Sequence, residues 1–333
     1  MSDSDLIILL IFLALPITYL LTNLVKIISN KIGFVNHPNP IVETHKIPIA
    51  YGGGIAIGIT AIMFLIFQST NISAALKYLL ILLPIIVVGI LDDIFRFKSF
   101  IKLLLQIFSS LPFVIFYIDV QFYFAITALF LILAAQNSWN LIDIMDGLLA
   151  GISTIVFISA AIILQPFADL NFYSNLSLFI GLSVLGFRFL NKYPAKIFLG
   201  ETGSLLLGSL FAFTVIITFL INPITAGYVF LLGSIPLFEL VFLIIVRTKK
   251  GILFYKGSPD HFALRLLEKG FEVKRINRIV LSICFFHSLI IVLSNFFLPS
   301  EYFFVCGNIT LFFGITAYNY LKSLPVRKMR VDN

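Results

Sequence analysis

The sequence predicts an all-α, polytopic integral membrane protein, and three observations support this fold class. Of the 333 residues, 60% are hydrophobic and 12% are charged, whereas soluble domains carry about 25% charged residues. The apolar residues form runs long enough to cross the hydrocarbon core, which takes about 20 residues in a helix. Basic residues collect in alternate loops between these runs. Little of the chain is left for a soluble part, so we expect a single transmembrane domain over residues 1–333.

About eleven transmembrane helices follow from the lengths of the apolar runs. The expected ranges are 5–28, 51–68, 74–91, 99–118, 120–136, 149–166, 175–190, 203–221, 226–247, 277–298 and 302–321. The run 120–136 gives the weakest prediction, because almost no loop precedes it. The first run follows acidic residues and has no small-residue cleavage site after it, so we expect a retained helix rather than a signal peptide.

The basic residues also predict which way the helices face. One set of loops carries many Lys and Arg residues, for example Arg96, Lys98, Lys249 and Lys250, whereas loops such as "QSTNIS" and "INPIT" carry none. Because basic loops stay cytoplasmic, the N-terminus is expected outside and the C-terminus in the cytoplasm, with the protein in the inner (plasma) membrane. The net charge of +7 reflects this asymmetry and suits anionic lipid head groups. It does not indicate a nucleic-acid partner.

Most acidic and amide side chains of interest fall on the predicted cytoplasmic side. They come from four segments: Asp92 and Asp93; Asn140, Asp143 and Asp146; Asn191 and Glu201; and Asp260 and His261. Hard oxygen ligands with Lys and Arg among them suit Mg²⁺ and a phosphorylated substrate. Phosphoryl transfer needs such a set to neutralise phosphate oxygens and position the reactants. The glycine-bearing turns "YGGGIAI", "MDGLLAG" and "FLGETGS" fit either close approach of phosphate or close helix packing.

These segments, taken in order, resemble the polyprenyl-phosphate N-acetylhexosamine-1-phosphate transferases. "LDDIFRFK" resembles the paired-aspartate motif of that family, and "NLIDIMDGLLAG" resembles its Asn-x-x-Asp-x-x-Asp-Gly motif. "NKYPAKIFLGETGSLLLG" resembles the long motif that usually ends in Phe-x-Gly-Asp-x-Gly-Ser. The resemblance implies transfer of a sugar-1-phosphate from a UDP-N-acetylhexosamine to a polyprenyl (undecaprenyl) phosphate. The products would be polyprenyl-diphospho-sugar and UMP, at the start of cell-envelope polysaccharide synthesis.

The same resemblance implies roles for individual residues. Asp92, Asp93 and Asp143 would be catalytic, and Glu201 with Asp92 would bind Mg²⁺, with Mn²⁺ as the alternative. Asp146 and Phe198 would hold the uracil. The full set expected to bind substrate is Asn140, Asp146, Asn191, Phe198, His261, Arg265 and Lys46.

Two positions depart from the family pattern. Glu201 stands where the family usually has a metal-binding Asp, so its carboxylate reaches one methylene farther. The last loop has the single His261, where the family's GlcNAc-1-phosphate enzymes have His-x-His-His and the muramoyl-pentapeptide enzymes have three in a row. This counts against the muramoyl-pentapeptide substrate. The sugar, the prenyl length and the choice between monomer and homodimer stay open.

Other interpretations remain at this stage. The acids can also be explained by solvated helix ends or by hydrogen bonds between helices, and His287 is best explained as a hydrogen-bonded core residue. A UbiA-type prenyltransferase also uses Asn and Asp at short helical spacing with Mg²⁺, but normally on two separate helices and without a segment like "FLGETGS". A transporter would carry its charges near the bilayer midplane, often in broken helices of an inverted repeat.

Overall fold

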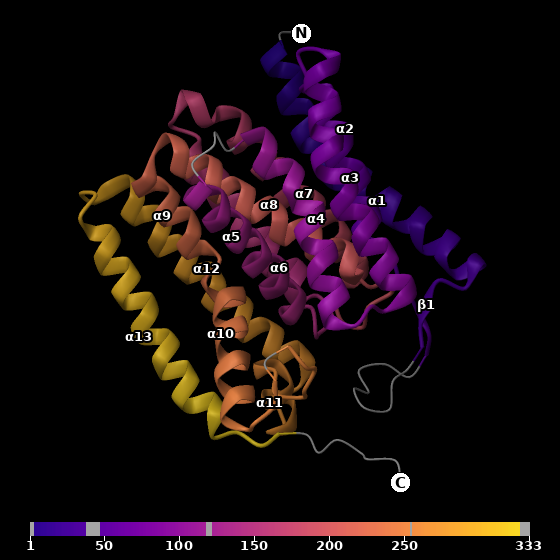
Figure 1. The fold of residues 1–333 in the computed structure, drawn as a ribbon, viewed down its shortest axis with the longest axis vertical. Coiled ribbons are helices and arrows are strands. Elements are labelled where there is room, and N and C mark those ends of the chain that lie inside the picture. Colours follow the sequence, from indigo (N-terminus) through magenta and orange to yellow (C-terminus); the bar gives the residue numbers. More distant parts are fainter. Residues whose placement is uncertain (1–2, 38–46, 118–121, 254, 327–333) are drawn as a thin grey trace.

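The computed structural model describes residues 3–37, 47–117, 122–253 and 255–326, and these residues are almost entirely helical (Figure 1). The helices are α1 Asp3–Ile32, α2 Gly53–Phe67, α3 Ile72–Phe95, α4 Ser99–Tyr117, α5 Phe122–Ile142, α6 Leu148–Leu164, α7 Asn171–Asn191, α8 Gly200–Ile221, α9 Pro223–Leu232, α10 Ser234–Lys249, α11 Phe262–Glu268, α12 Val273–Phe297 and α13 Tyr302–Lys322. A short 3-10 helix covers Ala168–Leu170. Two antiparallel strands, β1 Val35–Asn36 and β2 Ile49–Ala50, form the one sheet of the described residues. The predicted all-α class is confirmed.

Ten of the eleven predicted ranges coincide with one helix each, and the polytopic membrane class is confirmed as well. Within the described residues, eight helices are long and apolar enough to cross a membrane, and the bent pair of α9 and α10 makes a ninth if it counts as one span. The helices α2 and α6 are apolar but have only 15 and 17 residues. The number of eleven crossings therefore stays a prediction.

The expected single helix over 226–247 was wrong. The chain bends by 67° between α9 and α10. Two residues explain the bend: Pro236 has no N–H for the helical ladder, and a side chain on Gly233 would overlap the Phe211 ring. Ser234, just after the bend, lies 3.4 Å from His287, whose other ring nitrogen lies 2.9 Å from Thr310. The interpretation of His287 as a hydrogen-bonded packing residue is thereby confirmed.

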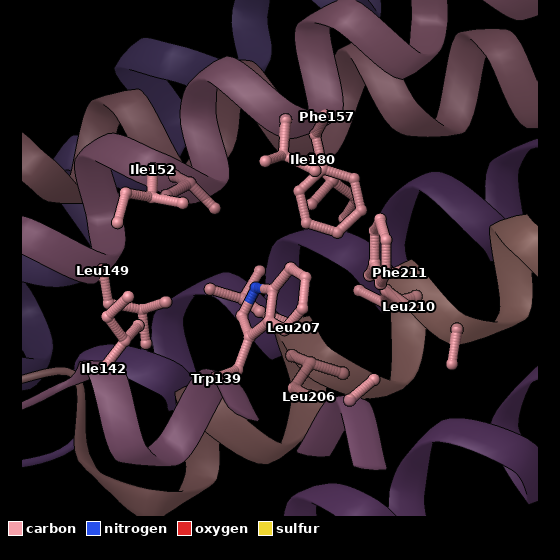
Figure 2. Close-up of a cluster of buried hydrophobic side chains, with 14 of the residues drawn as sticks. Trp139, Ile142, Leu149, Ile152, Phe157, Ile180, Leu206, Leu207, Leu210 and Phe211 are labelled. Carbon is pink, nitrogen blue, oxygen red and sulfur yellow. The ribbon is translucent and has the colours of Figure 1, made fainter. Parts of the chain in front are cut away.

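The helix α8 forms the centre of the fold. It packs against α2, α3, α5 and α9. Of the 18-residue apolar stretch of α8, 83% is buried inside the protein, compared with 11% of the corresponding stretch of α13. Figure 2 shows part of the core around it, where the Trp139 ring of α5 stacks on Phe211 of α8 with centroids 4.5 Å apart. The indole N–H of Trp139 donates to Ser153 of α6 at 3.1 Å. This rigid centre fixes where the first turn of α8 lies.

Glycines let the neighbouring helices approach that first turn closely. A side chain on Gly54 in α2 would overlap the backbone of Gly203, and one on Gly89 in α3 would overlap the backbone of Thr202. Small residues serve such close helix packing in membrane proteins. The packing interpretation is therefore confirmed for "YGGGIAI" and "FLGETGS". The contact also places Asp92 and Asp93, one turn beyond Gly89, beside the start of α8.

Candidate active site

The carboxylate of Asp93 caps the N-terminus of α8. Its oxygens accept hydrogen bonds from the amide of Glu201 at 2.8 Å and from the amide and hydroxyl of Thr202 at 3.2 and 2.8 Å. The preceding residue, Gly200, has a φ of +78°, and a side chain there would meet the Asp93 oxygens at 2.7 Å. A carboxylate at a helix N-terminus satisfies free N–H groups and complements the helix dipole. Asp93 thus fixes Glu201 relative to the end of α3.

A lysine from α4 lies at the centre of the site. The ammonium group of Lys102 is 2.5 Å from Glu201, 3.1 Å from Asp92 and 3.5 Å from the Asn140 amide oxygen. The amide nitrogen of Asn140 also donates to Glu201 at 2.6 Å. Four helices, α3, α4, α5 and α8, therefore meet at one cation. We call Asp92, Lys102, Asn140, Asp143 and Glu201 the acid cluster.

Asp143 is the acid of this cluster that has no cation. It follows the last residue of α5, and no hydrogen bond or ion pair joins its side chain to the described residues. Loss of hydration raises the pKa of Asp143 to about 8, and the charges of Glu201 and Asp93 act in the same direction. A half-buried carboxylate among other carboxylates is stabilised by a bound cation. Asp143 is therefore the member of the cluster that an external cation would stabilise most.

The turn that carries Asp143 is tied to the segment before α8. Asp146 accepts a hydrogen bond from the amide of Ala195 at 2.9 Å, and its backbone carbonyl accepts one from Asn277 at 2.7 Å. The Asn191 side chain accepts from the amide of Gly147 at 3.1 Å and donates to the carbonyl of Ile197 at 3.0 Å. Asp146 and Asn191 are thus buried side chains that join the two segments.

Phe198 lies on the other side of the same segment. Its amide donates to Ala50 at 2.8 Å, and its carbonyl accepts from Gly53 at 2.9 Å. Its ring is 6.1 Å from the ring of Tyr51. The loss of hydration around the half-buried hydroxyl raises the pKa of Tyr51 to about 12, and the Asp93 charge adds to this shift. The two rings therefore lie within the electrostatic range of the acids.

The remaining predicted residues belong to a second group of charges, between α10, α11 and the end of α13. Asp260 is bound by Arg265 at 2.7 Å and by Lys250 at 2.5 Å. Burial by itself would raise the pKa of Asp260, but the hydrogen bonds from Lys250 and Ser258 outweigh this effect and lower it. His261 lies 2.8 Å from Glu239 of α10. We call Glu239, Lys250, Asp260, His261 and Arg265 the loop cluster.

The donors of Arg265 are used inside the protein. Besides Asp260, its guanidinium donates to the backbone carbonyls of Leu321, Lys322 and Leu324 at 3.1 to 3.4 Å. The residue is 2% exposed. The predicted role of Arg265 in binding substrate is untested, but its contacts explain it as the link between the last loop and the end of α13.

The structure thus divides the predicted site residues. It brings Asp92, Asp93, Asn140, Asp143 and Glu201 together, and it joins Asp146, Asn191 and Phe198 to them through backbone contacts. Arg265 and His261 lie in the loop cluster, and Lys46 lies outside the described residues. Sequence reasoning missed Lys102 and Glu239. The available signal was similar in both cases: a charged residue inside the apolar part of a helix, which is costly and usually functional.

The donor set fits Mg²⁺ in a limited way. In the part of the chain that the structure describes, no three His, Cys, Asp or Glu side chains are close enough to hold a metal ion by themselves. Mg²⁺ commonly takes only one or two carboxylates and completes its shell with water and substrate phosphates. The Asp143 side chain has no hydrogen-bond or ion-pair partner among the residues that the structure describes, and the side-chain interactions of Glu201 fall on a single oxygen, Oε2. Both oxygens of Asp92 already accept from Phe97 or Lys102.

Comparison with known proteins assigns this architecture to a family. Residues 75–219 match the family model described as glycosyl transferase family 4. This range contains Asp92, Lys102, Asn140, Asp143 and Glu201, so it spans the whole acid cluster.

The relatives of this chain have two kinds of name. A probable undecaprenyl-phosphate N-acetylglucosaminyl 1-phosphate transferase of Bacillus subtilis is 30% identical over 294 residues, covering 81% of this chain and 80% of the relative. A phospho-N-acetylmuramoyl-pentapeptide-transferase of Staphylococcus epidermidis is 29% identical over 253 residues, covering 75% and 74%. One from Bacteroides thetaiotaomicron is 34% identical over 176 residues, covering 46% and 41%. Identity alone does not choose between the two names.

Proposed function

Because the chain belongs to glycosyl transferase family 4, we propose that it transfers a sugar-1-phosphate from a UDP-N-acetylhexosamine to undecaprenyl phosphate and releases UMP. The names of its relatives support this general reaction. The observation that carries the proposal is the acid cluster, where Lys102 is shared by Asp92 and Glu201 while Asp143 has no cation. This membership replaces the prenyltransferase and transporter interpretations.

The reaction follows from the charges of the site. An oxygen of the lipid phosphate attacks the β-phosphorus of the UDP-sugar, and the bond from that phosphorus to the bridging oxygen breaks as UMP leaves. A phosphate monoester has its second pKa near 6 and is largely dianionic at neutral pH. A strong general base is therefore unnecessary. Asp92 would instead orient Lys102, whose ammonium group would bind a phosphate oxygen.

We assign the expected Mg²⁺ to Asp143 and Glu201. When bound there, the ion would neutralise charge on the diphosphate. Without a cation, an anionic donor would be repelled by these carboxylates, which explains why the cluster needs one. Asp93 and Asn140 would hold Glu201 in place from two sides, through its amide and its carboxylate.

The proposed setting is the inner (plasma) membrane of a bacterium, with the acid cluster at the cytoplasmic face. The nucleotide sugar is a cytosolic solute, whereas the lipid phosphate lies at the head-group level, so an enzyme that joins them needs its polar groups there. A cysteine introduced at Asp169 should react with impermeant reagents from outside, and one introduced at Lys250 should not. Both positions are exposed on the protein. The reverse labelling would overturn this orientation.

The proposed sugar is an N-acetylhexosamine rather than a muramoyl-pentapeptide, because the last loop has His261 alone in place of three consecutive histidines. Purified protein should be incubated with undecaprenyl phosphate and either UDP-GlcNAc, UDP-GalNAc or UDP-MurNAc-pentapeptide, with release of UMP as the measurement. We expect turnover with one of the first two. Turnover with the pentapeptide donor alone would overturn the sugar assignment, and no UMP from any donor would overturn the reaction.

A further inference from the structure

We propose that Glu239 is a positioning residue for this reaction and that it acts through the imidazole of His261. The inference rests on the proposed function and on the expectation from the sequence that His261 contacts the substrate. Glu239 lies in the apolar helix α10 and is 1% exposed, and His261 is 8% exposed. A carboxylate buried so deeply is unfavourable unless it is paired and hydrogen-bonded. Its hydrogen-bond partners among the described residues are the His261 ring and the amide of Phe262, and the buried Arg247 guanidinium interacts with it electrostatically.

The contact fixes which ring nitrogen remains for a ligand. The carboxylate of Glu239 lies 2.8 Å from Nδ1 of His261, and its second oxygen lies 3.5 Å from the amide nitrogen of Phe262. An ionised carboxylate only accepts hydrogen bonds, so Nδ1 must carry the proton. The free position is then Nε2. A carboxylate partner that sets the tautomer and orientation of a functional imidazole is a recurring arrangement.

The backbone on either side of His261 is held by other residues. Arg265 donates to the carbonyl and the carboxylate of Asp260, at 2.9 and 2.7 Å. Ser258, two residues earlier, accepts from Arg247 of α10 at 2.9 Å. Because these contacts already anchor the loop, Glu239 is not needed to attach it. The distinct effect of the Glu239 carboxylate is therefore to orient the His261 ring.

The test separates orientation of the ring from attachment of the loop. His261→Asn keeps a donor where Nδ1 lies, so it preserves the Glu239 contact, but it removes Nε2. Glu239→Gln keeps the size of the side chain and removes its charge. The two variants, the double variant and the wild type are compared for kcat/KM of UMP release and for thermal midpoint. Lys250→Gln is the control, because Lys250 carries a charge of the same loop, is 41% exposed and pairs with Asp260 rather than with the ring.

We expect each single variant to lose about 10²-fold in kcat/KM while its thermal midpoint stays close to that of wild type. The double variant should be no worse than His261→Asn, because Glu239 has no effect without the ring. Lys250→Gln should stay within a few-fold of wild type. The proposal is wrong if His261→Asn is as active as wild type, or if the two losses multiply in the double variant.

Two further outcomes also decide the matter. Should Glu239→Gln fail to fold, the comparison of His261→Asn with wild type remains, and full activity of His261→Asn would overturn the proposal. If the wild type is active but the losses of the two single variants multiply in the double variant, only this inference is overturned. A wild type that releases no UMP from any UDP-sugar would remove the proposed function, and the inference with it.

Discussion

The acid cluster and the loop cluster are built in opposite ways. In the loop cluster each carboxylate has its own partner or partners: Asp260 binds Arg265 and Lys250, and Glu239 lies within hydrogen-bond distance of the His261 ring. In the acid cluster one ammonium group serves two carboxylates, and Asp143 has no cation. Buried charges that are fully paired need nothing further. The comparison teaches that a shortage of cations, rather than the number of acids, distinguishes the part of this protein where we propose that metal and phosphate bind.

The two clusters also differ in how their parts are held. Glycine contacts bring α2 and α3 against the first turn of α8, so Asp93 and Glu201 meet through rigid backbone. The loop cluster instead depends on side chains that fasten a loop to the end of α10 and to the end of α13. Changes in the acid cluster should therefore alter turnover more than folding, and changes in the loop cluster should do the reverse, with the His261 ring as the exception.

The largest expected effect comes from removing the metal. With EDTA, turnover should fall to background, and Mg²⁺ or Mn²⁺ should restore it, because the ion proposed at Asp143 and Glu201 would neutralise charge on the diphosphate. UMP release before and after chelation measures this. Undiminished turnover in metal-free buffer would show that the shortage of cations has another purpose.

Asp143→Asn should come next, with a loss of about 10²-fold or more in turnover and a folded, extractable protein. The pKa of Asp143 is raised from 3.8 to about 8 in the fold. Its ionisation therefore lowers stability progressively as pH rises from 4 to about 8, with a constant penalty above that range. In metal-free buffer the variant should accordingly gain thermal stability over wild type as pH rises from 6 to 9. Equal midpoints throughout that range would contradict the raised pKa.

Lys102→Met tests the shared cation, with an expected loss of about 10-fold to 10²-fold in turnover together with lower thermal stability. The change leaves Asp92, which is 4% exposed, without its counter-charge. The control is Lys98→Met, one turn earlier and exposed, which should behave as wild type. Equal effects of both variants would mean that Lys102 acts only by adding positive charge near the start of α4, and not through its contacts with Asp92 and Glu201.

The smallest effect on turnover is expected for Asp260→Asn, which should lower the thermal midpoint and change kcat by only a few-fold. The pKa of Asp260 is lowered in the fold, so its contribution to stability is present above pH 3.8 and is lost as pH falls below that value. The difference between wild type and variant should thus be constant from pH 6 to 9, unlike that of Asp143→Asn. A difference that grows with pH would contradict the assigned pairing.

The helices and the general place of the site were predictable from the sequence. Crossing a membrane is a local property of an apolar run, so run length located the long apolar helices, including the uncertain one at 120–136, but not the short α11. The bend at Gly233 was not predictable from run length, because the apolar run continues through it. Order of motifs was enough to predict the family, which the comparisons confirmed.

The sequence by itself determined that this is a helical membrane protein of this family, with its acids at the ends of apolar helices. The tertiary structure decided which of those acids is paired. Lys102 and Glu201 are 99 residues apart, and Glu239 and His261 are 22 apart. Whether such side chains meet depends on how the helices rotate and how closely they approach. That rotation is set by contacts such as Gly89 against Thr202, which no local pattern of residues encodes.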